Sequence, residues 1–434
     1  MLMPSRLLSQ CWIDTLRKLC DDSGRAWPRP TALMLDHTGP LPTLPVAKQI
    51  VGPECKTFMY WPGSAARLYS YLAPSNKGGF SDWEATVDKY YMDETLRMGR
   101  DRGEIAEAVC TAKNGTDKLI GMTISIPGLK DMYDYEREFG EVPMRSVVSR
   151  VLQETTSLVK STDAIICASA VALEGETLTA CKKYAAVYPV GIQIPPRGWL
   201  KNTEQSVIHD EKLRMFLNGN DSGSVILISF GSIVFPTNLS ALWILTSTLE
   251  KIGHPFVLVL GGLLVNAKVY ATDLARIRAG GIGFVCETWV DQLAVLQHPA
   301  VGWLVAHGGF NSAVESLVQG IPLVGWPLAP GDNAINVAML STRDKPVAFE
   351  LMQIRTGSAK EKPKRGGPRI TGTDESIRRE IEDIVSRMMG PEGLERHGAA
   401  KKVSTFKIAS PSPALKIASP SPTFKITSLG PPLS

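Results

Sequence analysis

A chain of 434 residues exceeds the size at which one hydrophobic core is usual, so two domains are expected. Hydrophobic residues make up 44% of the chain and charged residues 21%, which is typical of a globular protein and excludes a disordered one. The net charge of +4 is nearly balanced at this length and gives no reason to expect nucleic acid or an acidic membrane as a partner. The seven cysteines are scattered and include no CxxC pair, which favours a reducing compartment and no structural metal.

The first twenty residues lack the uninterrupted apolar core of a signal peptide, because Arg6, Gln10 and Asp14 interrupt it. Their apolar residues recur at helical spacing instead. The longest apolar runs, 225–235 and 255–265, are too short and too interrupted by glycine to span a bilayer. We therefore expect a cytoplasmic protein without a membrane span, and we expect a monomer.

Strands and helices alternate in the first half of the chain. Pro30–Asp36 is an apolar run that ends on an acid, and a turn and a helical stretch follow it. Residues 55–65 are expected to form a strand that leads into a helix starting near Ser64. Such alternation with short turns is typical of a parallel α/β sheet. Residues 74–141 have mixed periodicity and are expected to form irregular helices and loops over the sheet ends, where binding pockets usually lie.

The second half is more regular. The segment around Pro195 and Gly198 has the composition of a linker, so we expect a first domain over 1–195, a linker over 196–222 and a second domain over 223–390. Strands alternating with helices are expected in the second domain at 225–232, 255–262, 283–290, 301–307 and 321–327. Four or more such units predict a doubly wound sheet that binds ligands at the C-terminal ends of its strands.

Two later segments differ in composition. The basic run Lys360–Arg369 is expected to be a solvated loop before a helix at 374–389. The end of the chain carries three nine-residue repeats, at 405–413, 414–422 and 423–431, two of them with a Pro-Ser-Pro element. Such repeats favour an extended, disordered tail, which we place at 391–434. A phosphorylated or partner-binding tail is the alternative.

The stretch HGGFNS, His307–Ser312, carries the clearest chemistry. It lies where a strand is expected to become a helix, so its glycines allow the backbone to approach a ligand and its free N–H groups can meet an anion. His307 can donate a hydrogen bond to a phosphate oxygen, and Asn311 and Ser312 can add side-chain donors. The pattern predicts a diphosphate site.

Two residues near this stretch extend the site from a diphosphate to a nucleotide. Glu315, one helical turn after Asn311, offers two acceptor oxygens to the paired hydroxyls of a ribose. Trp289, at the end of another expected strand, can present its face to a flat uracil ring. With these residues the stretch resembles the nucleotide-sugar signature of the UDP-dependent glycosyltransferase family. The matching skeleton is WVDQ at 289–292, His298, Gly302, HGGFNS at 307–312, Glu315, GIP at 320–322 and GDN at 331–333.

The resemblance implies an α/β fold of the GT-B type, in which two Rossmann-like doubly wound domains face a cleft. It implies that the second domain binds a UDP-sugar through Ser232, Trp289, Gln292, His307, Gly309, Asn311, Ser312, Glu315, Asp332 and Asn333. Gln292 would contact the ribose, and Ser232 would lie beside the phosphates. We expect His298 to be a structural hydrogen-bonding residue instead.

Readout of the donor sugar is less well defined. Family members commonly end this signature with an acid followed by glutamine, and both touch the sugar hydroxyls. Here the pair is Asp332 and Asn333, and the acid comes one residue later than usual after Gly320. Because asparagine is shorter by one methylene, the identity of the hexose stays open.

In the first domain, Asp36 matches the family's strand-ending aspartate, which orients a catalytic histidine. The resemblance implies a direct displacement: the histidine takes the proton of the acceptor hydroxyl, the oxygen attacks the anomeric carbon, and UDP leaves with inversion. His307 and helix ends would stabilise the charge on the diphosphate. Neither a metal nor any other cofactor is required.

The family's catalytic histidine lies in a Gly-His pair well before the aspartate, and no such pair precedes Asp36 in this chain. His37 is next to Asp36, but neighbouring side chains on a strand point in opposite directions. We therefore expect the catalytic histidine to be absent, the first domain to be incomplete, and the chain to be an N-terminally truncated family member.

The sequence thus predicts a UDP-glycosyltransferase that moves a hexose to a hydroxyl of a small, apolar acceptor. The alternative is a catalytically inactive protein that binds nucleotide sugars without the histidine. A dinucleotide-dependent oxidoreductase is disfavoured, because no expected strand is followed by GxGxxG.

Overall fold

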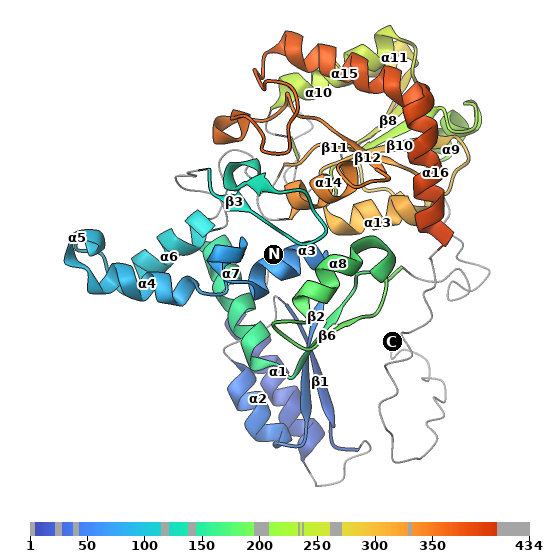
Figure 1. Cartoon of the computed structure of the whole chain (residues 1–434). Coiled ribbons are helices and arrows are strands. Elements are labelled where there is room, and N and C mark those ends of the chain that lie inside the picture. The colour runs from blue at the N-terminus through green and yellow to red at the C-terminus, as the bar shows by residue number, and fades with distance from the viewer. Residues whose placement is uncertain are drawn as a thin grey trace.

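The computed structural model describes residues 5–21, 28–37, 43–113, 121–137, 145–194, 208–232, 235–236, 238–260, 271–328 and 332–405. Two lobes, each built around a parallel sheet, lie against one another, and the helices between the sheets include α3, α8, α13 and α14 (Figure 1). This confirms the expected α/β architecture with two sheets.

The first sheet has the strand order β1-β2-β5-β6 and is parallel throughout. Its strands are β1 (Ala32–Asp36), β2 (Lys56–Trp61), β5 (Ala164–Cys167) and β6 (Val187–Pro189), and its helices are α1 (Ser5–Cys20), α2 (Leu44–Val51), α3 (Ala65–Leu72), α7 (Arg145–Ser161) and α8 (Val171–Cys181). Helix α3 begins where expected, because the Ser64 side chain accepts a hydrogen bond from the Arg67 N–H. The order runs in one direction from β1, so the described strands form one wing of a doubly wound sheet.

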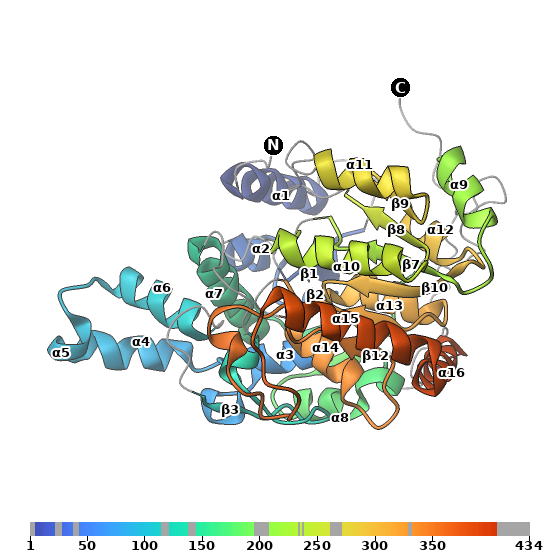
Figure 2. The same cartoon turned by 90° about the horizontal axis from the view of Figure 1, so that it is seen from above.

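The segment between β2 and α7 is irregular, as expected. Helices α4 (Trp83–Met92), α5 (Glu94–Arg97) and α6 (Arg102–Lys113) form an arm that projects from the first lobe (Figures 1 and 2). The arm is fastened at its base, where the Trp83 indole donates to Thr156 Oγ1 of α7 at 2.9 Å. The rest of the segment contains η2 (Ser75–Lys77), the antiparallel pair β3 (Thr123–Ile124) and β4 (Met132–Tyr133), and η3 (Asp134–Arg137).

The second sheet has the order β12-β11-β10-β7-β8-β9, with every strand parallel to its neighbours. Its strands are β7 (Val225–Ser229), β8 (Phe256–Val259), β9 (Gly283–Cys286), β10 (Val301–Ala306), β11 (Leu323–Gly325) and β12 (Ala348–Glu350). The chain first builds outward from β7 to β9 and then reverses to β10, so the switch point lies between β7 and β10. Ligands bind at that position in doubly wound sheets.

Two parts of the second lobe differ from expectation. Its helices are α9 (Glu211–Asn218), α10 (Leu239–Lys251), α11 (Ala271–Gly280), α12 (Gln292–Leu296), α13 (Phe310–Val318), α14 (Asn333–Ser341), η5 (Gly357–Lys360), α15 (Asp374–Met389) and α16 (Pro391–Thr405). Helix α9 falls inside the expected linker, yet Leu213 and Leu217 are buried in the core of this lobe. Helix α16 covers the first part of the expected disordered tail and packs against α13 and α15. Residues 406–434, with nearly all of the repeats, lie outside the described residues.

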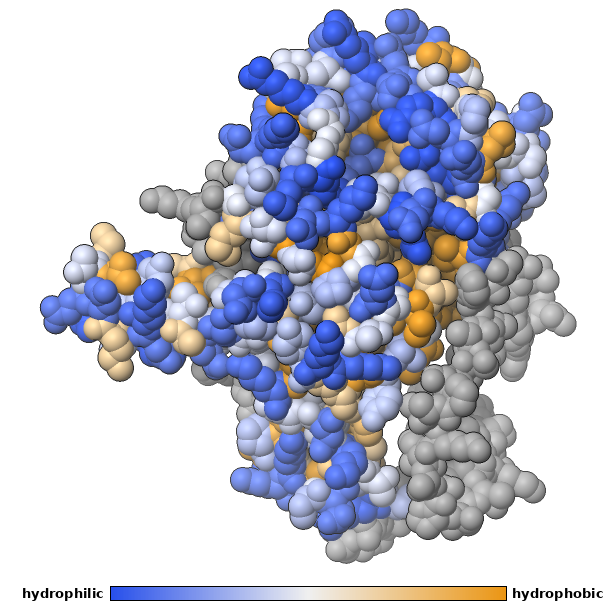
Figure 3. Space-filling view, in the orientation of Figure 1, coloured by the Kyte–Doolittle hydropathy of each residue, from blue (hydrophilic) through white to orange (hydrophobic). Residues whose placement is uncertain are grey.

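The two lobes share apolar cores. Ile335 and Ala338 of α14 are buried in the core of the first lobe, and Ala170 and Leu173 at the start of α8 are buried in the core of the second. Figure 3 shows apolar side chains gathered at the waist between the lobes, whereas the outer face of the second lobe is mostly hydrophilic. The lobes are therefore held by burial of apolar surface as well as by the connecting chain.

A buried ionic network also crosses the interface. Most of the basic loop is exposed, as expected, but Arg365 is an exception. The Arg365 side chain is only 5% exposed, and its Nε donates to Glu136 Oε2 at 2.9 Å. Its terminal nitrogens donate to the two carboxylate oxygens of Glu350, which also pairs with Arg355. The loop is ordered around Arg365 because two buried carboxylates, one from each lobe, neutralise the guanidinium.

Candidate functional site

The HGGFNS loop lies at the switch point of the second sheet. Strand β10 ends at Ala306, Gly308 has a φ of +85°, and Gly309 is the N-cap of α13. The first i to i−4 bond of the helix runs from the Ala313 N–H to Gly309 O, so the N–H groups of residues 310–312 precede it. Such N–H groups, together with the helix dipole, form an anion site. The predicted strand-to-helix transition is confirmed.

His307 is wedged between two glycines. A Cβ on Gly309 would lie 2.3 Å from His307 Nε2, and one on Gly231, after β7, would lie 2.9 Å from Cε1. The His307 ring can therefore occupy this position only because residues 231 and 309 have no side chain. Its Nδ1 is buried without a hydrogen-bond partner. Burial lowers the pKa of His307 and the charge of Asp332 opposes this, so the ring is neutral at pH 7 and one nitrogen is a donor.

Gln292 connects three elements at the same sheet edge. The hydroxyl of Ser229, the last residue of β7, donates to Gln292 Oε1 at 2.7 Å, and Gln292 Nε2 donates to Glu315 Oε2 on α13 at 2.7 Å. Burial raises the pKa of Glu315, and the Gln292 hydrogen bond opposes that rise. The two residues predicted to hold the ribose are thus in direct contact. The sequence analysis did not identify Ser229, because its partner is 63 residues away.

Trp289 lies outside the strand in which it was placed. Strand β9 ends at Cys286, where it pairs with Val259, the last residue of β8, so the ladder cannot reach Trp289. The Trp289 side chain is 71% exposed. Ser232, after the Gly231 turn, is also exposed. A largely exposed indole in the loop that leads to Gln292 offers its face to a planar ring.

We expect the fluorescence of Trp289 to report nucleotide binding. A stacked uracil would remove the indole from water, so UDP should change the emission of the wild type, and Trp289→Phe should lose that change while retaining an aromatic face. Trp289→Ala should weaken binding by about 1–3 kcal/mol, the usual contribution of base stacking. The chain has nine tryptophans, so the difference between wild type and Trp289→Phe is the quantity to measure. The same spectral change in both proteins would remove Trp289 from the site.

The N-terminus of α14 lies against the HGGFNS loop. Asp332 Oδ1 accepts from Asn333 Nδ2 at 3.0 Å, and Asp332 Oδ2 accepts from Asn336 Nδ2 at 3.1 Å. Asn336 Nδ2 also donates to Gly308 O at 2.9 Å. Asn333, predicted to touch the sugar, is 4% exposed and its amide is turned toward Asp332. Asn336 was not predicted, although a polar residue inside the apolar sequence of α14 is a signal for it.

Asp36, the predicted catalytic aspartate, ends β1 with a side chain that is 51% exposed. The expectation that His37 points away from it is wrong, because His37 Nδ1 lies 3.3 Å from Asp36 Oδ1. Residue 37 lies in the turn after the strand, where the alternation of side chains no longer holds. His37 packs edge-on against Trp61, and Trp61 belongs to the same buried core as Ile335 and Ala338 of α14, so the end of β1 lies on the side of the first lobe that meets the second.

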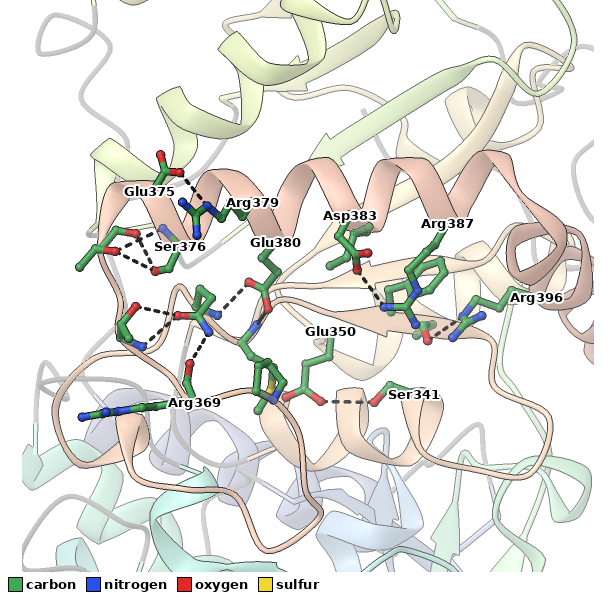
Figure 4. A pocket seen from close by; sticks show the side chains of 18 residues that line it. Ser341, Glu350, Arg369, Glu375, Ser376, Arg379, Glu380, Asp383, Arg387 and Arg396 are labelled. Carbon is green, nitrogen blue, oxygen red and sulfur yellow. Dashed lines mark hydrogen bonds and ion pairs between the residues drawn. The ribbon is translucent and has the colours of Figure 1, made fainter.

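Two other features lie apart from this site. His298 is structural, as expected: its Nε2 lies 3.0 Å from Asn218 Oδ1, and its Nδ1 accepts from the Ala300 N–H. A cavity of about 700 Å³ opens beside β12 and α15 (Figure 4), and no predicted site residue lines it. Several of its charged side chains are paired with one another, for example Arg387 with Asp383 and Arg379 with Glu375.

Some features are absent from the part of the chain that the structure describes. No three His, Cys, Asp or Glu side chains are grouped there as metal ligands. None of the described helices is both long and apolar enough to cross a membrane.

Comparison with known sequences finds a family match in the second half of the chain. Residues 201–359 match the family described as UDP-glucoronosyl and UDP-glucosyl transferase, and this range contains Trp289, His307 and Glu315. This match lies in the part of the chain that carries the predicted nucleotide site. One family relative, the UDP-glycosyltransferase eriJ of Hericium erinaceus, is 27% identical over 281 residues, which are 62% of this chain and 54% of the relative. The soyasapogenol B glucuronide galactosyltransferase of Glycine max is 36% identical over 138 residues, which are 30% of this chain and 26% of the relative.

Solved structures of family members share the fold. A transferase of Siraitia grosvenorii in complex with UDP has a TM-score of 0.63 and 20% identity, over 93% of this chain and 84% of that one. Phytolacca americana UGT2, complexed with UDP-2fluoro-glucose and pterostilbene, has a TM-score of 0.60 and 21% identity, over 92% and 75%. The two-lobed fold is the GT-B fold, as predicted. The chain spans about half the length of the Hericium erinaceus relative that it matches.

Proposed function

We propose that the chain binds a UDP-sugar at the C-terminal edge of the second sheet and transfers its hexose to a hydroxyl of a small, apolar acceptor. The observation that carries this proposal is the junction of β10 and α13, where His307 sits between Gly231 and Gly309 beside the first N–H groups of the helix. The adjacent pair of Gln292 and Glu315 suits a ribose, and Trp289 suits a uracil. The proposal includes a monomeric, cytoplasmic protein that uses no metal and binds no nucleic acid.

Each group has a chemical task in the proposed reaction. The N–H groups of residues 310–312 and the neutral His307 ring stabilise the charge that develops on the diphosphate as the bond to the sugar breaks. Asp332 at the start of α14 accepts hydrogen bonds from the hexose hydroxyls. The acceptor reaches the anomeric carbon from the first lobe, opposite the diphosphate, and a single displacement from that side inverts the configuration.

A second candidate function is binding of the nucleotide sugar without transfer. It is favoured by the separation of the groups, because the residues that suit the nucleotide all belong to the second lobe and Asp36 belongs to the first. Calorimetry with UDP, together with assays of UDP release from UDP-hexoses with and without phenolic, lipid and sterol acceptors, distinguishes the two functions. Binding without any release would support the second.

Replacing His307 or Glu315 by alanine should abolish measurable UDP binding under either function. The first change removes a buried donor and the second removes the acceptors for two ribose hydroxyls. Each loss corresponds to about 1.5–3 kcal/mol per hydrogen bond that involves a charged group. His209→Ala, at an exposed histidine before α9, is the matched control and should bind as the wild type does. Unchanged affinity in both site variants would rule out this assignment of the nucleotide.

A further inference from the structure

Ser229 is a buried polar residue at the centre of the second sheet. It ends β7, where it pairs with Val259 of β8 on one side and with Ala306 of β10 on the other. It is 6% exposed, and its hydroxyl donates a hydrogen bond to Gln292 Oε1 at 2.7 Å. Since central strands are among the last elements of a fold to open, this hydroxyl keeps its position.

Gln292 is anchored at the start of α12. Its neighbour Asp291 is the N-cap of this helix, and the Asp291 side chain accepts a hydrogen bond from the Ala294 N–H at 3.1 Å. Val295 and Leu296, in the same short helix, are buried in the core of the second lobe. The cap and the buried residues hold the backbone that carries Gln292, so only the orientation of its side-chain amide remains to be determined.

The hydrogen bonds of the Gln292 amide determine its orientation. Its Nε2 donates to Glu315 Oε2 at 2.7 Å and to Ser312 Oγ at 3.4 Å, both on α13. An ionised carboxylate can only accept hydrogen bonds, so the N–H side of the amide faces Glu315 and Oε1 faces Ser229. The reverse orientation would place Oε1 against the carboxylate. The hydroxyl of Ser229, as a donor to Oε1, therefore favours the orientation in which Gln292 holds Glu315.

Gln292 and Glu315 differ in what they leave open for a ligand. The Nε2 group of Gln292 makes both of its hydrogen bonds within the protein. Glu315 is half-buried, and its second oxygen, Oε1, receives no hydrogen bond from any residue that the structure describes. A carboxylate held through one oxygen can direct the other at a ribose hydroxyl, in a charge-assisted hydrogen bond. Glu315 is thus the residue of this pair that is suited to contact a ribose.

We propose that Ser229 and Gln292 are positioning residues for the Glu315 carboxylate, and that this carboxylate selects ribonucleotides over deoxyribonucleotides; this rests on the proposed UDP-sugar site. Glu315 Oε1 accepts a hydrogen bond from a ribose hydroxyl, Gln292 holds Oε2, and Ser229 holds the Gln292 amide. Gln292 thus acts on the nucleotide through Glu315. The three residues connect β7, α12 and α13, so the orientation of the carboxylate depends on a residue at the centre of the sheet.

The test measures the Kd values of UDP, 2′-deoxy-UDP and 3′-deoxy-UDP by calorimetry. The quantity compared is the ribose ratio, defined as the Kd of the weaker-binding deoxy nucleotide divided by the Kd of UDP. In the wild type this ratio should be about 10–100, the usual effect of one hydrogen bond to a charged group. Ser229→Ala and Gln292→Leu should each lower the ribose ratio by about threefold or more, because the carboxylate loses its fixed orientation.

Ser316 provides a matched control on the same helix. It is fully buried next to Glu315, and its hydroxyl donates to the Ile321 carbonyl at 3.0 Å. Ser316→Ala should reduce stability as Ser229→Ala does but leave the ribose ratio unchanged. Glu315→Gln keeps one acceptor oxygen and should lower the ratio, and adding Gln292→Leu to it should lower the ratio no further, whereas a direct contact between Gln292 and the ribose would give a further loss.

The pH dependence of UDP binding provides a second measurement. Burial raises the pKa of Glu315, the hydrogen bond from Gln292 lowers it, and the charge of Asp291 on α12 raises it. The ionised carboxylate is the form that accepts from the ribose, so affinity should fall as the pH drops through this pKa. Gln292→Leu removes the contribution that lowers the pKa, so the fall should begin at higher pH than in the wild type. Ser316→Ala should follow the wild type, and the titration of UDP itself is common to all the proteins.

The outcomes separate this proposal from the proposed function. A ribose ratio that is unchanged in Ser229→Ala or in Gln292→Leu overturns the role of the residue replaced, and so does an acid fall in affinity that Gln292→Leu does not move. Gln292 is half-buried, so Gln292→Leu keeps the test available if Ser229→Ala unfolds. A wild type that binds UDP and both deoxy nucleotides equally overturns the selection by Glu315 and leaves UDP binding standing. A wild type that does not bind UDP overturns the proposed function itself.

Discussion

Arg365→Met is expected to destabilise the folded chain by about 3–5 kcal/mol, the usual effect of removing one partner from a buried ion pair. Glu136 is fully buried, and without Arg365 it keeps hydrogen bonds from two backbone N–H groups but loses its neutralising charge. Glu350 keeps Arg355, so most of the penalty arises at Glu136. Urea denaturation monitored by circular dichroism measures the change.

The neighbouring residue offers a matched control for Arg365. Lys364 is exposed, and its ammonium lies 5.0 Å from the centre of the Tyr133 ring, so Lys364→Met should change stability by less than about 1 kcal/mol. Glu136→Gln combined with Arg365→Met should recover part of the loss, because the double variant leaves no bare carboxylate at position 136. Equal stability of Arg365→Met and Lys364→Met would contradict the role of the network.

The contribution of this network to stability should decrease in acid. Burial pushes the pKa of Glu350 upward, but Arg365 and Arg355 outweigh burial and lower it to about 2. A carboxylate with a depressed pKa stabilises the fold above its unfolded pKa of about 4.3, and this contribution disappears as the pH falls toward 2. Arg365→Met removes one of the two charges that lower the pKa of Glu350, so the loss of stability in acid should begin at higher pH in this variant.

Gly308→Ala is expected to weaken UDP binding by about 100-fold, equivalent to about 2.7 kcal/mol. An added Cβ would lie 2.6 Å from Val337 Cγ2 and 2.8 Å from the Asn333 carbonyl oxygen. The second atom is backbone, so α14 or the loop must move, and both carry residues of the proposed site. Positive φ adds about 1–2 kcal/mol of backbone strain to the folded state. Calorimetry with UDP and thermal unfolding measure the two effects.

Gly281 allows the two effects at Gly308 to be separated. Its φ is +70°, and a Cβ there would meet nothing within 4 Å. Gly281→Ala should therefore show the backbone strain alone, with stability reduced and UDP affinity unchanged. Normal UDP binding by Gly308→Ala would mean that the loop after β10 does not hold the diphosphate.

The sequence predicted those features that depend only on residues close together in the chain. One such feature is the change from strand to helix around His307, which glycines mark in the sequence. The structure has β10 ending and α13 beginning at that position. The start of α3 at Ser64 was predictable for the same reason, since the cap and its acceptor N–H are three residues apart. These features follow from backbone conformation and short-range hydrogen bonds.

Features that depend on distant partners were not predictable. Arg365 and Glu136 are 229 residues apart, so composition indicated only a basic loop. The end of β9 depends on where β8 stops, which is why Trp289 was placed on a strand. Helix α16 was overlooked because the repeats next to it dominated the composition, although Pro391 at its first position and the residues after it favour a helix.

The network around Arg365 also limits how the two lobes can be recombined. A hybrid protein that takes its first lobe from another protein and its second lobe from this chain would bury Arg365 without a neutralising charge unless the new lobe brings a carboxylate to the position of Glu136. Such an exchange of whole lobes would destabilise the protein at the interface between the lobes. The segment around η3 has to accompany the loop of Arg365, so these two distant stretches form one unit of inheritance.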